Sequence, residues 1–117
     1  MTEPRFVSVD IVAGAAEEGA PAPDRIISGS PRFRTWNVEE AAGGLYAGIW
    51  ESTPGKWRIE YDEWEFCHIL SGVSVITEDG GEVRRVEADD SFIIRPGFKG
   101  SWEVLETTRK EYVIRAA

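Results

Sequence analysis

Two short segments carry most of the side chains that could do chemistry in this chain. The first has Glu63, Glu65 and Cys67 at alternate positions, and the second has Lys110 and Tyr112 at alternate positions. If both segments are β-strands, each set lies on one face of its strand. A carboxylate and an ammonium on facing strands can form an ion pair, orient a polar ligand or move protons.

The alternation also predicts which neighbours share the interior with Glu65. It places Tyr61 and Glu63 on the same side as Glu65. An interior lysine needs a partner, because an isolated ammonium in a low-dielectric site is heavily penalised. We therefore predict that Glu65 pairs with Lys110.

The single cysteine and the single histidine do not indicate catalysis. Alternation from Glu65 sends Cys67 inward and His68 to the opposite face. A neighbouring carboxylate would raise the pKa of the thiol, which disfavours a nucleophilic cysteine. We expect His68 to pack between layers or at a subunit contact. A lone cysteine forms no internal disulfide, which is compatible with a reducing compartment.

The composition predicts one all-β domain that has no nucleic-acid or membrane partner. The 117 residues include five Trp, five Phe and three Tyr, which favour strands. The net charge of −8 and the pI near 4.7 disfavour phosphate backbones and anionic lipid surfaces. The first ten residues lack a basic start followed by an apolar core. We expect a soluble cytoplasmic protein.

Period-two patterns separated by turn residues predict about ten short strands. Residues 5–12 form either a first strand or an extended arm, and the Gly- and Pro-containing residues 13–24 form a loop. We divide the chain into this arm and loop, residues 1–27, and a barrel, residues 28–117. The other predicted strands include residues 45–51, 66–70, 73–77, 82–86, 91–95, 101–105 and 111–114.

Several motifs together give a family resemblance. From about residue 28 to residue 114 the chain resembles the small cupins of the cupin 3 domain group, which includes the domains of (S)-ureidoglycine aminohydrolase. The resemblance implies an RmlC-like cupin, a double-stranded β-helix or jelly-roll barrel, and a homodimer. The matching motifs are Gly48–Glu51, Thr53–Gly55, Glu65–Gly72, Asp79-Gly80, Pro96–Trp102 and Arg109-Lys110-x-Tyr112.

The metal ligands typical of cupins are missing from these motifs. The two first-segment histidines would fall on Ile59 and Tyr61, or on the residue before each, and the second-segment histidine on Gly100. Of the usual set only Glu65 remains. We therefore predict no bound metal and no other cofactor.

An atypical divalent metal stays open as an alternative. Glu63, Glu65 and Cys67 could supply three ligands, but carboxylates around a turn need favourable geometry.

Two positions depart from the family pattern. Asp89-Asp90 stands where Gly-Asp is usual, so the turn must hold a side chain in a conformation that aspartate tolerates. Arg95 stands where many cupins have proline, and we expect it to place a cation near the mouth of the pocket.

We predict that the barrel interior binds a small polar metabolite without a histidine-bound metal. A first alternative is a metal-independent or atypical-metal hydrolase or isomerase, with Glu65 as acid or base and Tyr61 or Lys110 assisting. A second is a dimeric interaction scaffold, which a pocket filled by its own aromatic side chains would favour. The predicted ligand-binding residues are Trp57, Tyr61, Glu63, Glu65, Cys67, Trp102, Lys110 and Tyr112.

Overall fold

The computed structural model describes residues 5–11 and 16–117, and its regular structure is almost entirely β-strand. No helix in these residues is long and apolar enough to cross a membrane. The all-β prediction is therefore confirmed. The elements are β1 (Glu17–Gly19), the 3-10 turn η1 (Pro23–Arg25), β2 (Ile26–Gly29), β3 (Phe33–Ala41), β4 (Leu45–Ser52), β5 (Gly55–Glu60), β6 (Trp64–Glu78), β7 (Val83–Glu87), β8 (Ser91–Ile94) and β9 (Lys99–Arg115).

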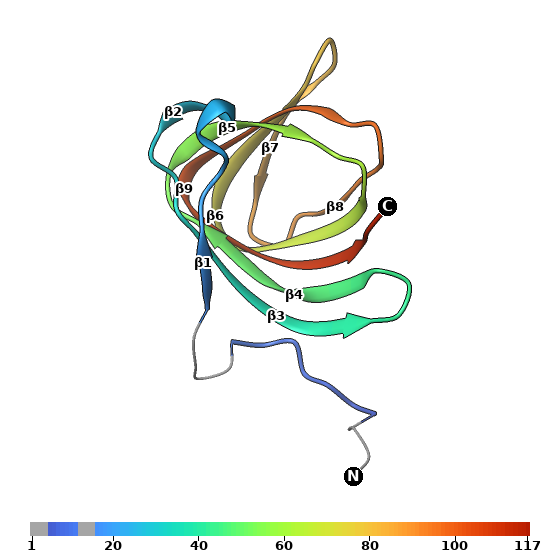
Figure 1. Ribbon diagram of the computed structural model, residues 1–117. Helices are drawn as coiled ribbons and strands as arrows, with labels where there is room; N and C mark the ends of the chain where they lie inside the picture. The colour runs from blue at the N-terminus through green and yellow to red at the C-terminus, as the bar shows by residue number, and fades with distance from the viewer. Residues whose placement is uncertain (1–4, 12–15) are drawn as a thin grey trace.

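Two long strands, β6 and β9, pair with each other and hold the barrel together (Figure 1). The second half of β9 pairs with β4, and the first half of β6 pairs with β8. The first half of β9 pairs with β5, and the second half of β6 pairs with β7. Each long strand thus runs from one face of the barrel to the other. Beyond β4, the strands β3 and β1 extend one face, and beyond β5, the strand β2 extends the other.

Gly72 lies where β6 bends between the two faces. Its φ is 87°, and a Cβ at this position would lie 2.1 Å from the carbonyl oxygen of Thr107 on β9. The register of the β6–β9 pair shifts on both sides of this point. Only glycine permits both the conformation and the close approach of the two backbones.

The strand boundaries correct several predictions. Two long strands were each predicted as two separate strands. The single strand β6 contains the predicted strands 66–70 and 73–77, and the single strand β9 contains 101–105 and 111–114. Local breaker signals fail here because a long strand can bend through a glycine or a register shift without ending. The segment predicted as a loop contains β1, which pairs with β3.

The N-terminal arm carries no strand in its described part. Residues 5–11 are irregular and exposed, and Val12 lies outside the described residues. Phe6 is 86% exposed. The trace runs away from the barrel in Figure 1. Of the two alternatives predicted here, a first strand or an extended arm, the strand is absent over residues 5–11, because no described strand lies beside them to supply hydrogen bonds.

Asp89 occupies the turn between β7 and β8 with a φ of 75°. This confirms the prediction that the turn holds an aspartate in the left-handed conformation. The backbone N–H of Asp89 donates to the carbonyl of Ile69, and Asp90 accepts from the N–H of Glu87. These bonds fix the start of β8 against β6.

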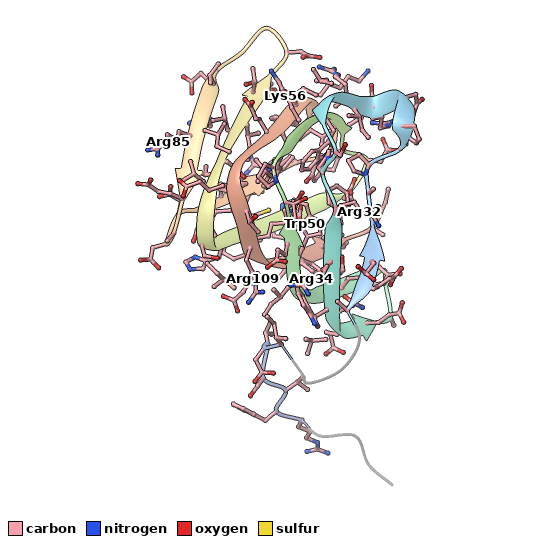
Figure 2. All side chains as sticks on the ribbon, turned by 90° about the vertical axis from the view of Figure 1, so that its left-hand side faces the viewer. Arg32, Arg34, Trp50, Lys56, Arg85 and Arg109 are labelled. Atoms are coloured by element: carbon pink, nitrogen blue, oxygen red, sulfur yellow. The ribbon has the colours of Figure 1, made fainter. Side chains whose placement is uncertain are left out.

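An ion cluster braces the outer surface where β3, β4 and β9 lie side by side. Arg34 Nη2 lies 2.9 Å from Glu51 Oε1, and Arg109 Nη2 lies 2.8 Å from Glu51 Oε2. Both guanidinium groups also lie over the ring of Trp36. Figure 2 shows Arg34 and Arg109 next to each other. These contacts hold together the strands whose other faces line the interior.

Candidate ligand-binding cavity

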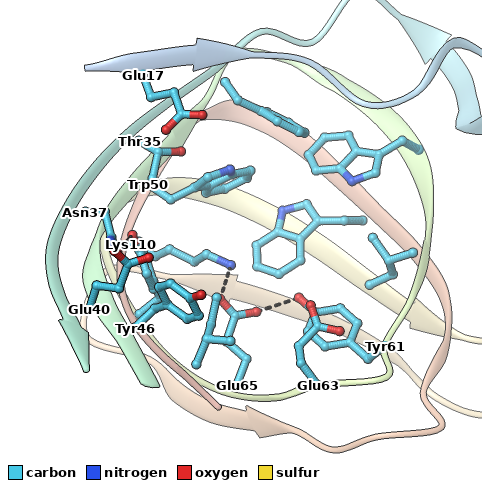
Figure 3. A pocket seen from close by; sticks show the side chains of 16 residues that line it. Glu17, Thr35, Asn37, Glu40, Tyr46, Trp50, Tyr61, Glu63, Glu65 and Lys110 are labelled. Carbon is cyan, nitrogen blue, oxygen red and sulfur yellow. Dashed lines mark hydrogen bonds and ion pairs between the residues drawn. The ribbon is translucent and has the colours of Figure 1, made fainter. Parts of the chain in front are cut away.

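The barrel interior contains a cavity of about 480 Å³ (Figure 3). Its size is within the range of small-molecule sites in proteins. Its walls combine aromatic rings with carboxylates, hydroxyls, an amide and one ammonium. The lining residues are Glu17, Phe33, Thr35, Asn37, Glu40, Tyr46, Trp50, Trp57, Ile59, Tyr61, Glu63, Glu65, Trp102, Lys110, Tyr112 and Ile114.

Strand alternation explains how the sequence lines this cavity. On β5 every second residue from Trp57 faces inward, and the same holds for β9 from Lys110 to Ile114. On β3 the inward set changes from odd to even numbers after Asn37, because the register shifts between Asn37 and Glu39. This irregularity turns the Glu40 carboxylate toward the cavity.

A buried ion pair forms the polar floor of the cavity. Lys110 Nζ lies 3.0 Å from Glu65 Oε2, and both side chains are nearly inaccessible to solvent. The Tyr61 hydroxyl donates to the other oxygen, Oε1, at 2.6 Å. Both carboxylate oxygens of Glu65 therefore already accept a hydrogen bond, and the predicted pairing of Glu65 with Lys110 is present in the structure.

The protonation states of this floor follow from burial and charge. Burial raises the pKa of Tyr61 well above its usual value, and the Glu65 carboxylate adds to the effect, so the phenol stays a neutral donor. Burial alone would lower the pKa of Lys110, but Cys67 and Glu65 raise it above the usual value. Lys110 is therefore an ammonium at neutral pH and a poor nucleophile.

Aromatic rings form the opposite wall. Trp57 and Trp102 stack with ring centres 6.4 Å apart, and Phe33 meets Trp57 edge-on at 5.1 Å. Trp50 meets Trp102 edge-on at 5.6 Å. The Lys110 ammonium lies 4.7 Å from the centre of the Trp50 ring and 4.5 Å from that of Trp102. The polar floor and the aromatic wall thus meet at Lys110.

A buried hydrogen-bond chain fixes the orientation of Trp102. Its indole N–H donates to Ser74 Oγ at 3.0 Å. Ser74 Oγ lies 2.7 Å from Thr108 Oγ1, which donates to the carbonyl of Glu106. A side chain held in this way keeps its shape when the cavity is empty, which favours a preformed site.

The structure brings together most of the predicted site residues. Trp57, Tyr61, Glu63, Glu65, Trp102, Lys110 and Tyr112 all line the cavity. Cys67 faces inward and is fully buried, but it does not line the cavity. Its sulfur lies 3.6 Å from Lys110 Nζ.

The chemistry of Cys67 agrees with the sequence analysis. Burial raises the pKa of its thiol to about 12, although Lys110 acts in the opposite direction. Tyr112, whose hydroxyl donates to Asn37 Oδ1 at 2.7 Å, also has a pKa raised to about 12, mainly by burial. Neither group ionises near neutral pH.

Several lining residues escaped sequence reasoning. Glu17 lies in the segment predicted as a loop, and Glu40 follows the irregularity on β3. Trp50 could have been found, because it lies at an inward position of a correctly predicted strand. Phe33 and Thr35 lie two residues apart on β3, and their shared face lines the cavity.

Arg95 and His68 both lie outside this cavity. Arg95 is exposed and lines a separate hollow with residues of β7, β8 and the turn after β8, so the prediction that it lies near the mouth of this cavity is wrong. The buried neighbour Ile94 faces inward, and alternation turns Arg95 away. His68 lies on the outer face as predicted, where its Nδ1 is 2.7 Å from Ser91 Oγ.

The residues that would hold a cupin metal do not fit one here. Within residues 5–11 and 16–117, no three His, Cys, Asp or Glu side chains form a group that could hold a metal ion. A Cβ at Gly100, the position of the second-segment histidine, would lie 1.9 Å from the carbonyl oxygen of Thr77. The backbone at this point leaves no room for a ligand side chain.

The fold and this cavity define a cupin barrel, and a family comparison agrees. Residues 39–112 match the EutQ-like cupin domain family. Because the match covers more than half of the chain, the protein belongs to this family. The predicted jelly-roll cupin fold is therefore confirmed. No curated protein matches the chain.

Solved structures with the same fold come from several bacteria. A protein of unknown function of the DUF861 family from Pseudomonas syringae pv. tomato str. DC3000 superposes with a TM-score of 0.79 at 25% identity, over 87% of this chain. This chain spans only 45% of that protein. Similarity to ureidoglycine aminohydrolase itself is not shown by these comparisons.

Two EutQ structures are also similar. The Clostridium difficile EutQ protein has a TM-score of 0.66 at 20% identity, covering 75% of this chain and 65% of that one. A putative ethanolamine utilization protein EutQ from Salmonella typhimurium LT2 has a TM-score of 0.65 at 17% identity, covering 84% of this chain and 79% of that one. At these identities the likeness supports the fold.

Proposed function

We propose that this cupin barrel binds a small polar metabolite in its interior without a histidine-bound metal. The observation that carries the proposal is the cavity of about 480 Å³ left between the polar floor and the aromatic wall. An apolar pocket with a few convergent polar groups is the usual architecture of a small-molecule site. A scaffold without a ligand would gain packing energy by filling this space.

The hydrogen bonding of Glu65 supports binding over acid-base catalysis. A general base needs an oxygen that can reach a substrate proton. Both Glu65 oxygens accept hydrogen bonds from side chains that stay protonated at neutral pH, namely Lys110 and Tyr61. Neither oxygen is therefore free to take a proton from a substrate unless one of these donors moves away. The floor is thus suited to orienting a ligand.

The experiment that tests this proposal uses protein purified without an affinity tag or chelator. Metal content per chain is measured by inductively coupled plasma mass spectrometry, and small molecules bound to the protein are sought by native mass spectrometry. The proposal predicts no stoichiometric metal and an adduct that is lost on denaturation. Stoichiometric Mn, Fe, Ni or Zn would contradict it and would direct attention to Glu63, Glu65 and Cys67.

A second candidate is a metal-independent hydrolase or isomerase. The specific observation in its favour is the continuous path Tyr61–Glu65–Lys110, along which a proton could move if a substrate displaced one donor. Once a substrate is found, Glu65→Gln should abolish its turnover. Unchanged turnover in that variant would rule out this role.

A further inference from the structure

We propose that the cavity selects an organic cation, an ammonium group attached to an apolar body. This inference rests on the proposed function and names the class of its ligand. The lining contains four carboxylates, those of Glu17, Glu40, Glu63 and Glu65, against the single ammonium of Lys110. The interior is therefore acidic even after Lys110 has neutralised Glu65.

Three of these carboxylates have no cationic partner among the described residues. None of the salt bridges within residues 5–11 and 16–117 involves Glu17, Glu40 or Glu63. Glu63 accepts a hydrogen bond from the backbone N–H of Asp62. Figure 3 shows Glu17 and Glu40 on one side of the cavity and Glu63 beside Tyr61 and Glu65.

The burial of the four carboxylates increases from the rim to the floor. Glu17 and Glu40 are exposed, Glu63 is half-buried, and Glu65 is 3% exposed. A recess with low-dielectric walls and charges of one sign concentrates the field inside it. A cation gains energy along this path, whereas an anion meets repulsion before it can reach Lys110.

Lys110 shows how such a cation can be held. Its ammonium is bound by one carboxylate, at 3.0 Å, and lies over two indole rings. The same two kinds of group recur elsewhere in the lining, at Glu63, Trp57 and Phe33. Among the described residues, these three have no ion pair or cation–π contact with a Lys or Arg side chain. Aromatic faces combined with carboxylates are the usual means of recognising ammonium ligands.

The test compares three probes that share a phenylethyl body: phenethylammonium, 2-phenylethanol and 3-phenylpropionate. Binding is measured by isothermal titration calorimetry at neutral pH and low salt. We expect the cation to bind at least about tenfold more tightly than the neutral probe, and the anion to bind least. Added salt should reduce the preference, because part of it comes from exposed carboxylates.

Variants locate the effect. Glu63→Gln and Glu17→Gln should each weaken the binding of the cation by about threefold or more and leave the affinity for the neutral probe unchanged. Glu18→Gln is the matched control, since Glu18 is the exposed neighbour of Glu17 and does not line the cavity. Thr35→Trp, a bulky substitution in the wall, should abolish binding of all three probes while the protein keeps a cooperative unfolding transition.

Each other result overturns the inference in a recognisable way. If the neutral or anionic probe binds as tightly as the cation and Thr35→Trp blocks it, the choice of a cation is wrong but the cavity still binds small molecules. If phenethylammonium fails to bind up to about 10 mM, the interior does not select ammonium ions. If its binding survives Thr35→Trp, the cation binds outside the cavity, and the inference is also wrong.

Discussion

Replacing Lys110 with methionine tests the buried ion pair on which the cavity floor depends. The substitution removes the ammonium but keeps an unbranched side chain of similar length. It leaves Glu65 with the Tyr61 hydroxyl as its remaining side-chain donor. The Lys110 and Glu65 side chains are only 6% and 4% exposed, so water compensates for little of the lost interaction.

The magnitude follows from the cost of an unpaired buried charge. Removing one member of a buried pair typically destabilises a protein by about 3–5 kcal/mol. The lost contacts of the ammonium with Trp50 and Trp102 add to this cost. We expect Lys110→Met to lower the free energy of unfolding by about 4 kcal/mol. Glu65→Gln in the Lys110→Met background should recover at least about 2 kcal/mol, because both charges are then gone.

Urea denaturation followed by tryptophan fluorescence measures these changes. The slope of unfolding free energy against urea concentration should stay constant across the wild type, both single variants and the double variant. A loss below about 1 kcal/mol in Lys110→Met would show that the pair is solvated and that it does not stabilise the cavity floor as a buried ion pair. A double variant that is less stable than Lys110→Met would contradict the prediction as well.

Three further predictions concern the fold, the thiol and the arm. Gly72→Ala should destabilise the barrel by about 3 kcal/mol or more, because of the positive φ and the 2.1 Å approach to Thr107; a loss under about 1 kcal/mol in urea denaturation would contradict this. Burial raises the pKa of the Cys67 thiol from 9.0 to about 12, so the thiol ionises in the unfolded chain before it ionises in the folded one, and stability should fall as the pH rises from 9 toward 12. This fall should be smaller in Cys67→Ala, and an equal dependence of unfolding free energy on pH in both proteins would contradict the prediction. If the exposed apolar arm joins a homodimer, deleting residues 1–13 should halve the particle mass measured by light scattering, and an unchanged mass would exclude the arm as the contact.

Alternation along strands made much of the interior predictable from sequence. The sequence predicts interior positions for Trp57, Tyr61, Glu65 and Lys110. To find which face of a strand a side chain occupies, only the alternation along that strand is needed. The predicted Glu65–Lys110 pair followed from the cost of burying a lone charge. Neither inference required knowledge of how the strands are ordered in space.

The remaining features depend on pairing between distant segments. Glu17 lines the cavity because β1 pairs with β3, although its surroundings contain the residues of a loop. Glu40 faces inward because of a register shift in β3 that no local signal marks. The continuity of β6 through Gly72 likewise depends on the backbone of β9, which lies against it. Such non-local contacts override local propensity.

The most direct test of ligand binding is saturation-transfer NMR on a mixture of polar metabolites, recorded with metal-free wild-type protein and with Thr35→Trp. We expect at least one compound with an ammonium group to receive saturation from the wild type but not from the variant. If no compound distinguishes the two proteins, the cavity is not a ligand site, and the proposed function is wrong.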